Sequence, residues 1–591
     1  MSAEHVLVLP RLAESLTEAR VVAWLVSEGD TVVPGQPVVE VDADKFVVGL
    51  EVDQPCIVQR FLQREGAVVP VGETLAWLVP TGASAPAPAV TPAPVAAAPV
   101  SPVQVAALVL AAAAPLASAS VPSAPVVPAP SVVTPPAVAA PAFAPAPAPT
   151  AAQPSGGRPV PPPAGAGGAA AARFDAMQGF QLEPLTAAGK RFCALAEEHA
   201  RAVAPRAERS DKEGRLAVES YREMQRSGFA AACVPEAFGG LGLDSLHDLT
   251  VGVSRLGRAD ASTAIAMNMH LASVWTLTRY WRAARLANEG AVAVRLEAVL
   301  RQIGEGRLLQ SVVGSEAGTD ILHPLTEARQ DTLGWRINGR KIFGTLSEVA
   351  DVFHITVRVP RPDGGYDTAM VTLPRGAPGL TILNDWDALG MRGSASHSLE
   401  LKDCFVTDGM MRSHGPWGEW NATLLEAQVS GNIGLLGAYL GVAEAARTLI
   451  LPSLHKRRKA PADTPLAERA GVQRGVAELE VTLSSARAVL GRIGMLADTF
   501  FRGLAPGQAD LSSAHLLMKE FQSAKWFVNR KAIEIVDQAL QLSGGSGYMA
   551  SSPLARLYRD VRAGPFMQLF SPNEAFDYIG KVALGLDPVI E

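Results

Sequence analysis

The first 80 residues alternate short apolar runs with turn residues, a pattern that predicts β-strands. Residues 28–35 and 65–72 are similar to each other: in both, two glycines stand six positions apart with apolar residues between them. Two similar halves predict a sandwich with approximate twofold symmetry, whose glycines occupy turns of positive φ. The polar residues 42–45 interrupt two valine-rich strands, so we expect a hairpin tip at Lys45.

The pattern changes beyond residue 180. Residues 180–305 show helical spacing of apolar positions, broken by a glycine-rich loop at 234–242. Strand-like segments follow within 307–415, and helical spacing returns from about 421 to the end. Pro452 is expected to interrupt the first of these later helices. The pattern predicts a multidomain protein in which an all-β unit precedes an α+β region of helical, β and helical parts.

Composition separates these parts. Residues 81–172 hold 22 of the 45 prolines but only one charged residue, Arg158, and one aromatic residue, Phe143. Such a stretch cannot bury enough apolar surface to offset the entropy lost on ordering, so we expect a flexible Ala/Pro-rich linker. A coil of this length spans about 50–60 Å, enough for the first unit to visit the large region, a neighbouring subunit or another enzyme. The predicted domains are 1–80, 81–172, 173–306, 307–420 and 421–591.

Charge and cysteine content exclude several functions. Residues 1–80 have a net charge of −7, the linker adds +1, and the remainder is neutral, which argues against a nucleic-acid partner. The four cysteines contain no CxxC pair, which excludes a thiolate zinc site and favours a reducing, cytoplasmic location. We expect no secretory signal and no membrane span, because the most apolar run, 105–117, is short and contains Pro115. No P-loop, HExxH or GxSxG motif supports metal-dependent or hydrolytic chemistry.

The internal repeat and the Asp-Lys tip make residues 1–80 resemble the lipoyl domains of 2-oxoacid dehydrogenase complexes. The resemblance implies a lipoyl barrel-sandwich fold, with lipoate attached to Lys45 by a lipoate ligase or transferase. Related biotin carriers have methionine on both sides of the lysine, whereas Asp44 and Phe46 flank it here, which favours lipoate. The attached arm would carry a reversible dithiol. The alternative is a decayed domain with an unmodified surface lysine.

Four motifs in order make residues 180–585 resemble the acyl-CoA dehydrogenase family. They are Val-Pro-Glu-Ala-Phe-Gly-Gly-Leu-Gly at 234–242, Gly-Met-Arg-Gly-Ser at 390–394, Gln-Leu-Ser-Gly-Gly-Ser-Gly-Tyr at 541–548 and Leu-Tyr-Arg-Asp-Val at 557–561. The resemblance implies bound FAD, a homodimer or homotetramer, and an electron acceptor such as an electron-transfer flavoprotein. In the family's reaction a base takes the α proton of an acyl thioester and flavin N5 takes the β hydride.

The resemblance also assigns residues around the flavin ring. Residues 311–320 match the family loop over the flavin, with Val313 where a hydroxyl is usual and Thr319 supplying a hydroxyl at a second position. Phe343 and Thr345 match the aromatic residue and the threonine that line the outer face of the flavin. The alternative for this last pair is an ordinary strand end.

A second set matches residues that reach the FAD of a partner subunit in the family. Arg457 stands at the position of the family's arginine, within a basic cluster that suits a pyrophosphate. Gln541, Gly544 and Gly545 match the FAD-binding loop that the partner contributes. The alternative for Arg457 is a solvated helix end.

The catalytic base departs from the family pattern. Gln568 occupies the usual position of the glutamate, and a glutamine cannot accept a proton as a carboxylate does. Some family members place the base on the first C-terminal helix, but that position is Gly431 here. Glu426 is the nearest carboxylate, with an ordinary helix glutamate as its alternative, and Glu574 is a further candidate. A positioned general base contributes ~10²–10⁴-fold to rate, so its loss bears directly on the reaction.

These observations leave three hypotheses. The first is an FAD-dependent dehydrogenase or reductase of an acyl thioester carried by CoA or by the lipoyl arm. The second is a base-less flavin enzyme of the same fold, either a monooxygenase or one that exchanges electrons with the dithiol of the arm. The third is a non-catalytic scaffold that carries a lipoyl domain.

Overall fold

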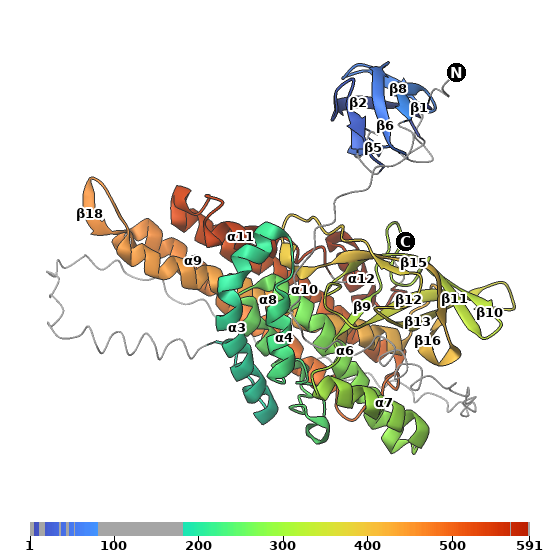
Figure 1. Cartoon of the computed structure of the whole chain (residues 1–591). Coiled ribbons are helices and arrows are strands. Elements are labelled where there is room, and N and C mark those ends of the chain that lie inside the picture. The colour runs from blue at the N-terminus through green and yellow to red at the C-terminus, as the bar shows by residue number, and fades with distance from the viewer. Residues whose placement is uncertain are drawn as a thin grey trace, which may run out of the picture. The chain divides into compact units, whose positions relative to one another are not determined.

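The chain divides into two compact units, one within residues 1–98 and the other within residues 99–591 (Figure 1). This computed structural model describes residues 5–10, 18–34, 37–42, 47–52, 54–80, 181–567 and 569–588. Each unit has a hydrophobic core of its own. The predicted linker at 81–172 lies outside the described residues.

The small unit consists of two four-stranded antiparallel sheets, with strand orders β1-β8-β6-β3 and β5-β4-β2-β7. Its strands are β1 His5–Val8, β2 Glu18–Trp24, β3 Thr31–Val32, β4 Pro37–Asp42, β5 Val47–Glu51, β6 Cys56–Phe61, β7 Val68–Pro70 and β8 Thr74–Pro80. Inward and outward residues alternate, as in β2, where Ala19 and Val21 are buried while Arg20 is exposed. The predicted all-β sandwich is confirmed.

The two copies of the repeat form equivalent contacts. Glu28 accepts the backbone N–H of Phe61 at 2.7 Å, and Glu65 accepts that of Trp24 at 2.9 Å. The rings of Trp24 and Phe61 stack with their centroids 3.9 Å apart. Gly29, the first glycine of one copy, has φ +98° and thus needs the freedom of glycine. These matching contacts agree with the approximate twofold symmetry predicted from the repeat.

The hairpin expected around the lysine joins β4 to β5. These strands pair antiparallel, and their last paired residues are Asp42 and Val47. The intervening residues 43–46, including Lys45, lie outside the described residues. Strand pairing therefore agrees with the predicted hairpin, and the role of Lys45 stays a prediction.

The described part of the large unit, from residue 181, begins with helices. They are α3 Ala187–Glu213, α4 Val218–Arg226, the 3₁₀ turn η2 Glu236–Phe238, α5 Leu246–Gly257, α6 Ala261–Leu286 and α7 Gly290–Gly304. Three of them begin at polar caps, because Thr186, Ser245 and Asp260 each accept the backbone N–H three residues further on. Helix α5 is buried along its whole length.

An eight-stranded sheet follows, with the order β14-β15-β11-β10-β12-β13-β16 and β9 paired to β12. Its elements are β9 Gln310–Val313, β10 Glu327–Asp331, β11 Gly334–Gly344, β12 Val352–Pro360, β13 Tyr366–Pro374, β14 Leu380–Ile382, η3 Arg392–Ser394, β15 His397–Val406, η4 Asp408–Met410 and β16 Met411–Pro416. These strands lie within residues 307–415, the region where the sequence predicts strand-like segments, except for the final residue of β16.

The remainder is mainly helical. It comprises α8 Ala422–Lys456, β17 Arg458–Lys459, β18 Ala462–Pro465, η5 Leu466–Glu468, α9 Ala470–Phe501, α10 Leu511–Ser543, η6 Gly544–Ser546, α11 Pro553–Val561 and α12 Pro572–Ala583. Helix α8 packs against α5, α6, α9 and α10. Among the described residues, α8 alone is long and apolar enough to cross a membrane, yet 83% of its most apolar window is buried within the protein. The predicted helix–sheet–helix order is confirmed.

One local prediction is wrong, and one element was not predicted. Pro452 does not interrupt its helix, because α8 continues through it to Lys456. The proline stands near the end of α8, where the missing N–H removes one late hydrogen bond rather than a central one. The short antiparallel pair β17–β18, which follows α8, was not expected from the sequence.

Candidate functional site

The loop after β9 begins in the core of the large unit. Val313 is 1% exposed at the end of β9. Two residues earlier, Ser311 donates to the carbonyl of Thr345 at 2.6 Å, which joins the start of this loop to the end of β11. The structure therefore holds the end of β9, where Val313 lies, next to Thr345 at the end of β11.

A buried ion pair between Lys341 of β11 and Glu316 holds the loop after β9 in place. Lys341 is fully buried and donates to the carboxylate of Glu316 and, at 3.2 Å, to the carbonyl of Gly314. Glu316 also accepts the backbone N–H groups of Leu325 at 2.9 Å and Thr326 at 3.1 Å. Burial lowers the pKa of Lys341 to about 8, and Glu316 opposes that shift. This pair fixes both ends of the loop, and the sequence reasoning missed it.

Phe343 is presented to solvent at the end of β11. Its side chain is 54% exposed and its φ is +57°, an unusual conformation for an aromatic residue. The ring of Trp386 lies edge-on to it with centroids 6.0 Å apart. A large apolar ring held outward in this way offers one wall for a planar cofactor.

Thr345 and Thr319 carry the two hydroxyls assigned to the site. Thr345 is 8% exposed, and its hydroxyl lies 2.8 Å from that of Ser396, which in turn is 2.7 Å from that of Ser394. Thr319 donates its hydroxyl proton to the carbonyl of His323 at 2.6 Å. The serine pair belongs to the motif at 390–394 and its continuation, so that motif supports Thr345 directly.

The second predicted group also forms a cluster. A Cβ added at Gly544 would lie 3.8 Å from the guanidinium of Arg457, although the two residues are 87 positions apart in the sequence. Gln541 and Gly545 are exposed beside them, and the carbonyl of Gln541 accepts the N–H of Gly544. Within the described residues, no acidic side chain pairs with Arg457. An unpaired guanidinium beside an exposed glycine turn suits a phosphate group.

No hydrogen bond or ion pair among the described residues joins the Phe343 group to the Arg457 group. Each has the chemistry that a flavin dinucleotide requires: an apolar wall and hydroxyls for the ring, and a cation with open glycines for the phosphates. The residues therefore fit a flavin. That the second group serves a partner subunit stays a prediction.

Gln568 itself lies outside the described residues, but its neighbours are placed. Lys525 of α10 donates to the carbonyl of Phe570, and Asn529, one turn further on, donates to that of Gly564 at 2.8 Å. Tyr439 of α8 donates to the sulfur of Met567 at 3.1 Å. The backbone on both sides of Gln568 is thus fixed to the helical bundle.

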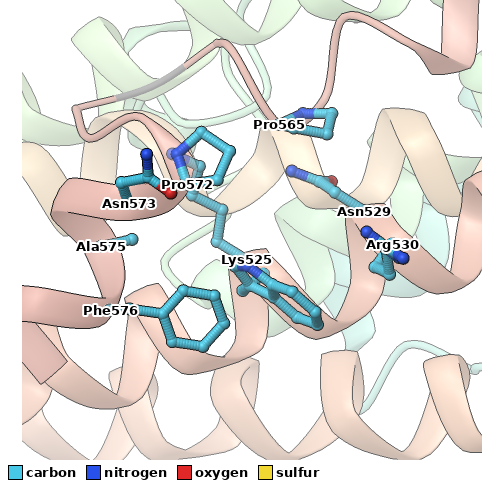
Figure 2. A pocket seen from close by; sticks show the side chains of 9 residues that line it. Lys525, Asn529, Arg530, Pro565, Pro572, Asn573, Ala575 and Phe576 are labelled. Atoms are coloured by element: carbon cyan, nitrogen blue, oxygen red, sulfur yellow. The ribbon is translucent and has the colours of Figure 1, made fainter. Parts of the chain in front are cut away.

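A cavity of about 270 Å³ lies between α10 and this segment. Figure 2 shows Lys525 and Asn529 on its α10 side, with Pro565 and Pro572 opposite. The Oδ1 atom of Asn529 is buried without a hydrogen-bond partner. Burial lowers the pKa of Lys525 to about 8.

The alternative base positions are also visible. Gly431 accepts a hydrogen bond from Asn268 through its carbonyl at 3.0 Å, and a Cβ added to it would meet nothing within 4 Å. Glu426 is 3% exposed, pairs with Arg279 at 3.1 Å and accepts the backbone N–H of Gly507 at 3.2 Å. Glu426 is therefore engaged in a buried structural contact, which favours the ordinary-glutamate alternative. Glu574 is likewise engaged, because it accepts the N–H of Ser571 at the start of α12.

Three family profiles match the large unit in chain order. They are the acyl-CoA dehydrogenase N-terminal domain at residues 190–284, the middle domain at 314–404 and the C-terminal domain at 433–572. Several bacterial relatives exceed 30% identity. Amino sugar nitrososynthase DnmZ of Streptomyces peucetius is 35% identical over 406 residues, which are 68% of this chain and 95% of the relative. The chain belongs to the acyl-CoA dehydrogenase family. It is a flavoenzyme of that family.

A second relative of this chain is the L-evernosamine nitrososynthase of a Micromonospora species. It is 36% identical over 407 residues, 68% of this chain and 92% of the relative. Among solved structures, KijD3 in complex with FMN and dTDP-3-amino-2,3,6-trideoxy-4-keto-3-methyl-D-glucose is similar, with a TM-score of 0.63 and 33% identity. That match covers 68% of this chain and 96% of KijD3.

The small unit matches a profile described as "Biotin-requiring enzyme" over residues 5–78. The chain therefore carries a lipoyl-type domain that precedes its flavoenzyme region in the sequence. The profile covers carriers of either biotin or lipoate, so lipoate on Lys45 stays a prediction.

Proposed function

We propose that this flavoenzyme is a monooxygenase that oxidises the nitrogen of an amine. Relatives named as nitrososynthases match 68% of this chain at 35% and 36% identity, which supports this reaction class. Among the three initial hypotheses, the proposal corresponds to the base-less flavin enzyme.

The observation that carries the proposal is the lack of an available carboxylate at either base position. One position is Gln568 and the other is Gly431, while the nearby Glu426 is paired with Arg279. Removal of a proton α to a thioester needs a strong, positioned base. An unprotonated amine instead brings its own lone pair as the nucleophile, so its oxidation places no such demand on the protein.

When bound in reduced form, the flavin supplies two electrons for the activation of molecular oxygen, so that one oxygen atom enters the amine and the other leaves as water. The chain's own residues bind and orient. The Lys341–Glu316 pair holds the loop after β9 in place. The Ser394–Ser396–Thr345 hydroxyl chain fixes the donor beside the exposed ring of Phe343.

A reduced-enzyme experiment tests the proposal. Purified protein is reduced anaerobically with NADH and a flavin reductase, then mixed with oxygenated buffer and an amino sugar nucleotide. We expect substrate-dependent formation of an N-oxygenated product that contains ¹⁸O from ¹⁸O₂. Hydrogen peroxide as the sole oxygen product, at every amine concentration, would refute the proposal.

Oxidation of an acyl thioester is the second candidate, favoured by the lipoyl-type domain at residues 5–78. In this version the acyl group is carried by CoA or by the arm on Lys45, and electrons leave to an electron-transfer flavoprotein. Anaerobic bleaching of the oxidised flavin by an acyl-CoA would support it. Bleaching by dihydrolipoamide would instead support electron exchange with the arm.

We also propose that Lys45 is lipoylated by a cytoplasmic ligase or transferase. The four cysteines are buried as thiols, which suits a reducing compartment. Intact mass of the protein from its native host is expected to show one lipoyl adduct, lost in Lys45→Ala. A biotinyl mass, or no adduct, would contradict the proposal without affecting the assignment of the flavoenzyme region.

A further inference from the structure

Two lysines are buried in the part of the chain that the structure describes, and only one of them has a carboxylate partner. Lys341 is fully buried and pairs with Glu316. Lys525 of α10 is 3% exposed, and among the described residues its ammonium group donates to the carbonyl of Phe570 and forms no ion pair. A charge withdrawn from water is costly unless it is paired. Lys525 therefore lacks the anionic partner that Lys341 has.

The ammonium group of Lys525 has donors to spare. It carries three N–H groups, and Phe570 accepts from one of them. Burial lowers the pKa of Lys525 to about 8, and the charge of Glu574 opposes that shift, so the amine stays mainly protonated at pH 7. The carboxylate of Glu574 accepts the backbone N–H of Ser571 instead of pairing with the lysine.

Lys525 lines the cavity of about 270 Å³ between α10 and the segment around Gln568. Figure 2 shows its side chain extending from α10 toward Pro572 and Asn573, which also line the cavity. These two residues begin α12, and the start of a helix carries partial positive charge because its first N–H groups have no acceptor within the helix. The buried lysine and the helix start thus give one side of the cavity a positive potential.

Arg530, further along α10, adds a second cation to the cavity wall. Its guanidinium reaches the carboxylate of Glu534 only at 3.8 Å, whereas Lys531 holds the same carboxylate at 2.7 Å. No carboxylate side chain is among the residues that line the cavity. The charge of the wall therefore favours an anion.

The rest of the wall is apolar. The rings of Trp526 and Phe576 meet edge-on with centroids 4.9 Å apart, and Pro565 and Ala575 lie beside them. Small-molecule sites typically combine apolar and aromatic walls with a few polar groups that fix orientation. A ligand that fits this cavity therefore has an apolar body as well as an anionic group.

The volume of the cavity limits the size of the ligand. Liquid water occupies about 30 Å³ per molecule, so 270 Å³ has room for about nine waters, or for a compound with roughly as many non-hydrogen atoms. An aromatic ring with a short carboxylate arm has this size. A flavin, a nucleotide or a CoA thioester is far larger, which separates this cavity from the candidate flavin site.

We propose that this cavity binds a small carboxylate with an aromatic or other apolar body, whose oxygens accept from Lys525 beside the start of α12. The inference is independent of the proposed amine oxidation, because none of the residues assigned to the flavin lines the cavity. Pro565 and Pro572 lie on the two sides of Gln568 along the chain, and Lys525 also holds the carbonyl of Phe570. A bound carboxylate would thus stabilise the backbone around Gln568.

Calorimetric titration of the flavin-loaded full chain with phenylacetate tests the inference. Phenylacetamide is the probe of the same shape without the charge, and inorganic phosphate supplies charge without an apolar body. We expect phenylacetate to bind the wild type, and both other probes to bind at least tenfold more weakly. Lys525→Met should lose at least tenfold in affinity for phenylacetate, whereas Lys531→Met, the matched control on the same helix, should bind like the wild type.

Phe576→Asp gives a second variant that does not disturb a buried residue, because Phe576 is 51% exposed. Its carboxylate would repel the ligand, so we expect it also to lose at least tenfold in affinity. The thermal midpoint shows whether each variant is folded, and Phe576→Asp keeps the test valid if Lys525→Met is not.

Three results would overturn the inference. They are no saturable binding of phenylacetate to the wild type, equal affinities for phenylacetate in the wild type and the folded variants at Lys525 and Phe576, and binding of phenylacetamide or phosphate as tight as that of phenylacetate.

Discussion

At the scale of single residues, the reaction depends on what stands where a carboxylate is usual. Glu426 is committed to Arg279, whose guanidinium also lies 5.1 Å from the ring centre of Trp275 and 4.6 Å from that of Phe501. Removal of one partner of such a buried ion pair typically costs about 3–5 kcal/mol of stability, so this glutamate has a structural role. Gly431, in contrast, faces open space.

A carboxylate introduced at Gly431 should move the enzyme toward dehydrogenation. Gly431→Glu adds a side chain where a Cβ meets no atom within 4 Å, and it replaces a glycine inside α8. The helix should gain up to about 1 kcal/mol from propensity. We expect acyl-CoA-dependent bleaching of the flavin to appear in this variant and in Gln568→Glu, measured by anaerobic stopped-flow.

Gly431→Gln is the control for that experiment, because it has the same size without the charge. Bleaching by the glutamine variant at the rate of the glutamate variant would show that the added group is not acting as a base. Stable variants that never bleach would contradict the placement of Gly431 and Gln568 beside the substrate.

Asp560 predicts a dependence of stability on pH. It is buried, and burial raises its pKa to about 7 from the usual 3.8, while Arg556 opposes the shift. The folded protein holds this proton more tightly than the unfolded chain does. The free energy of unfolding therefore falls as pH rises from about 4 to 7, by about 1.4 kcal/mol for each unit by which the folded pKa exceeds the unfolded one. Asp560→Asn removes the titration and can still accept the N–H of Met391.

The thermal midpoints of the wild type and Asp560→Asn are to be compared from pH 4 to 8. We expect the difference to shift in favour of the asparagine variant as pH rises to 7 and to stay constant above it. A difference that does not change with pH would mean that Asp560 is ionised throughout.

At the scale of elements, α10 controls the segment that contains Gln568. Lys525 and Asn529, one turn apart, hold the carbonyls of Phe570 and Gly564 on the two sides of that residue. Lysine and asparagine are buried here at 3% and 1% exposure, a costly arrangement unless their donors are used. Helix α10 therefore fixes the backbone on both sides of Gln568.

Loss of this support should lower turnover more than flavin content. Lys525→Met keeps length and apolar bulk but cannot donate to Phe570, so we expect kcat to fall about tenfold or more, the effect of a lost hydrogen bond of about 1.5–3 kcal/mol to a charged donor. Lys531→Met on the same helix, where the lysine pairs with Glu534 at 2.7 Å and is 31% exposed, is the control. Equal loss of flavin and turnover in Lys525→Met would indicate a general folding defect instead.

The order of elements followed from the sequence because periodicity is a local property. Strand spacing located β11, β12 and β13, and helical spacing located the regions on either side. The Lys341–Glu316 pair was not found, because its role depends on neighbours that the fold brings together. A lysine inside a predicted strand, as Lys341 is in β11, was the one available sequence signal for this pair.

At the scale of the whole molecule, we predict that the two groups of flavin residues serve sites shared between two chains. Arg457 lies beside Gly544, and Phe343 belongs to a separate group in the same chain. Family resemblance supplied this division, and the folded chain brings the members of each group together. The assembly itself stays a prediction.

Mixed dimers should therefore recover activity that neither parent has. Arg457→Ala removes the phosphate contact given to a partner, and Phe343→Asp places a charge at the chain's own exposed ring position, 54% exposed. We expect each variant alone to be inactive, and co-expression to restore about a quarter of wild-type activity if the pair assembles with twofold symmetry. Activity assays of tagged, co-purified mixtures give the measurement, and no recovery would place both groups in one chain's site.

The closeness of Arg457 and Gly544 has a further consequence. A flavin that is bound by residues of two chains also links those chains, so flavin binding and subunit association become thermodynamically coupled. Dilution would then release flavin as well as dissociate the subunits. In a host that is short of riboflavin, apo-monomers would accumulate before flavin-free dimers.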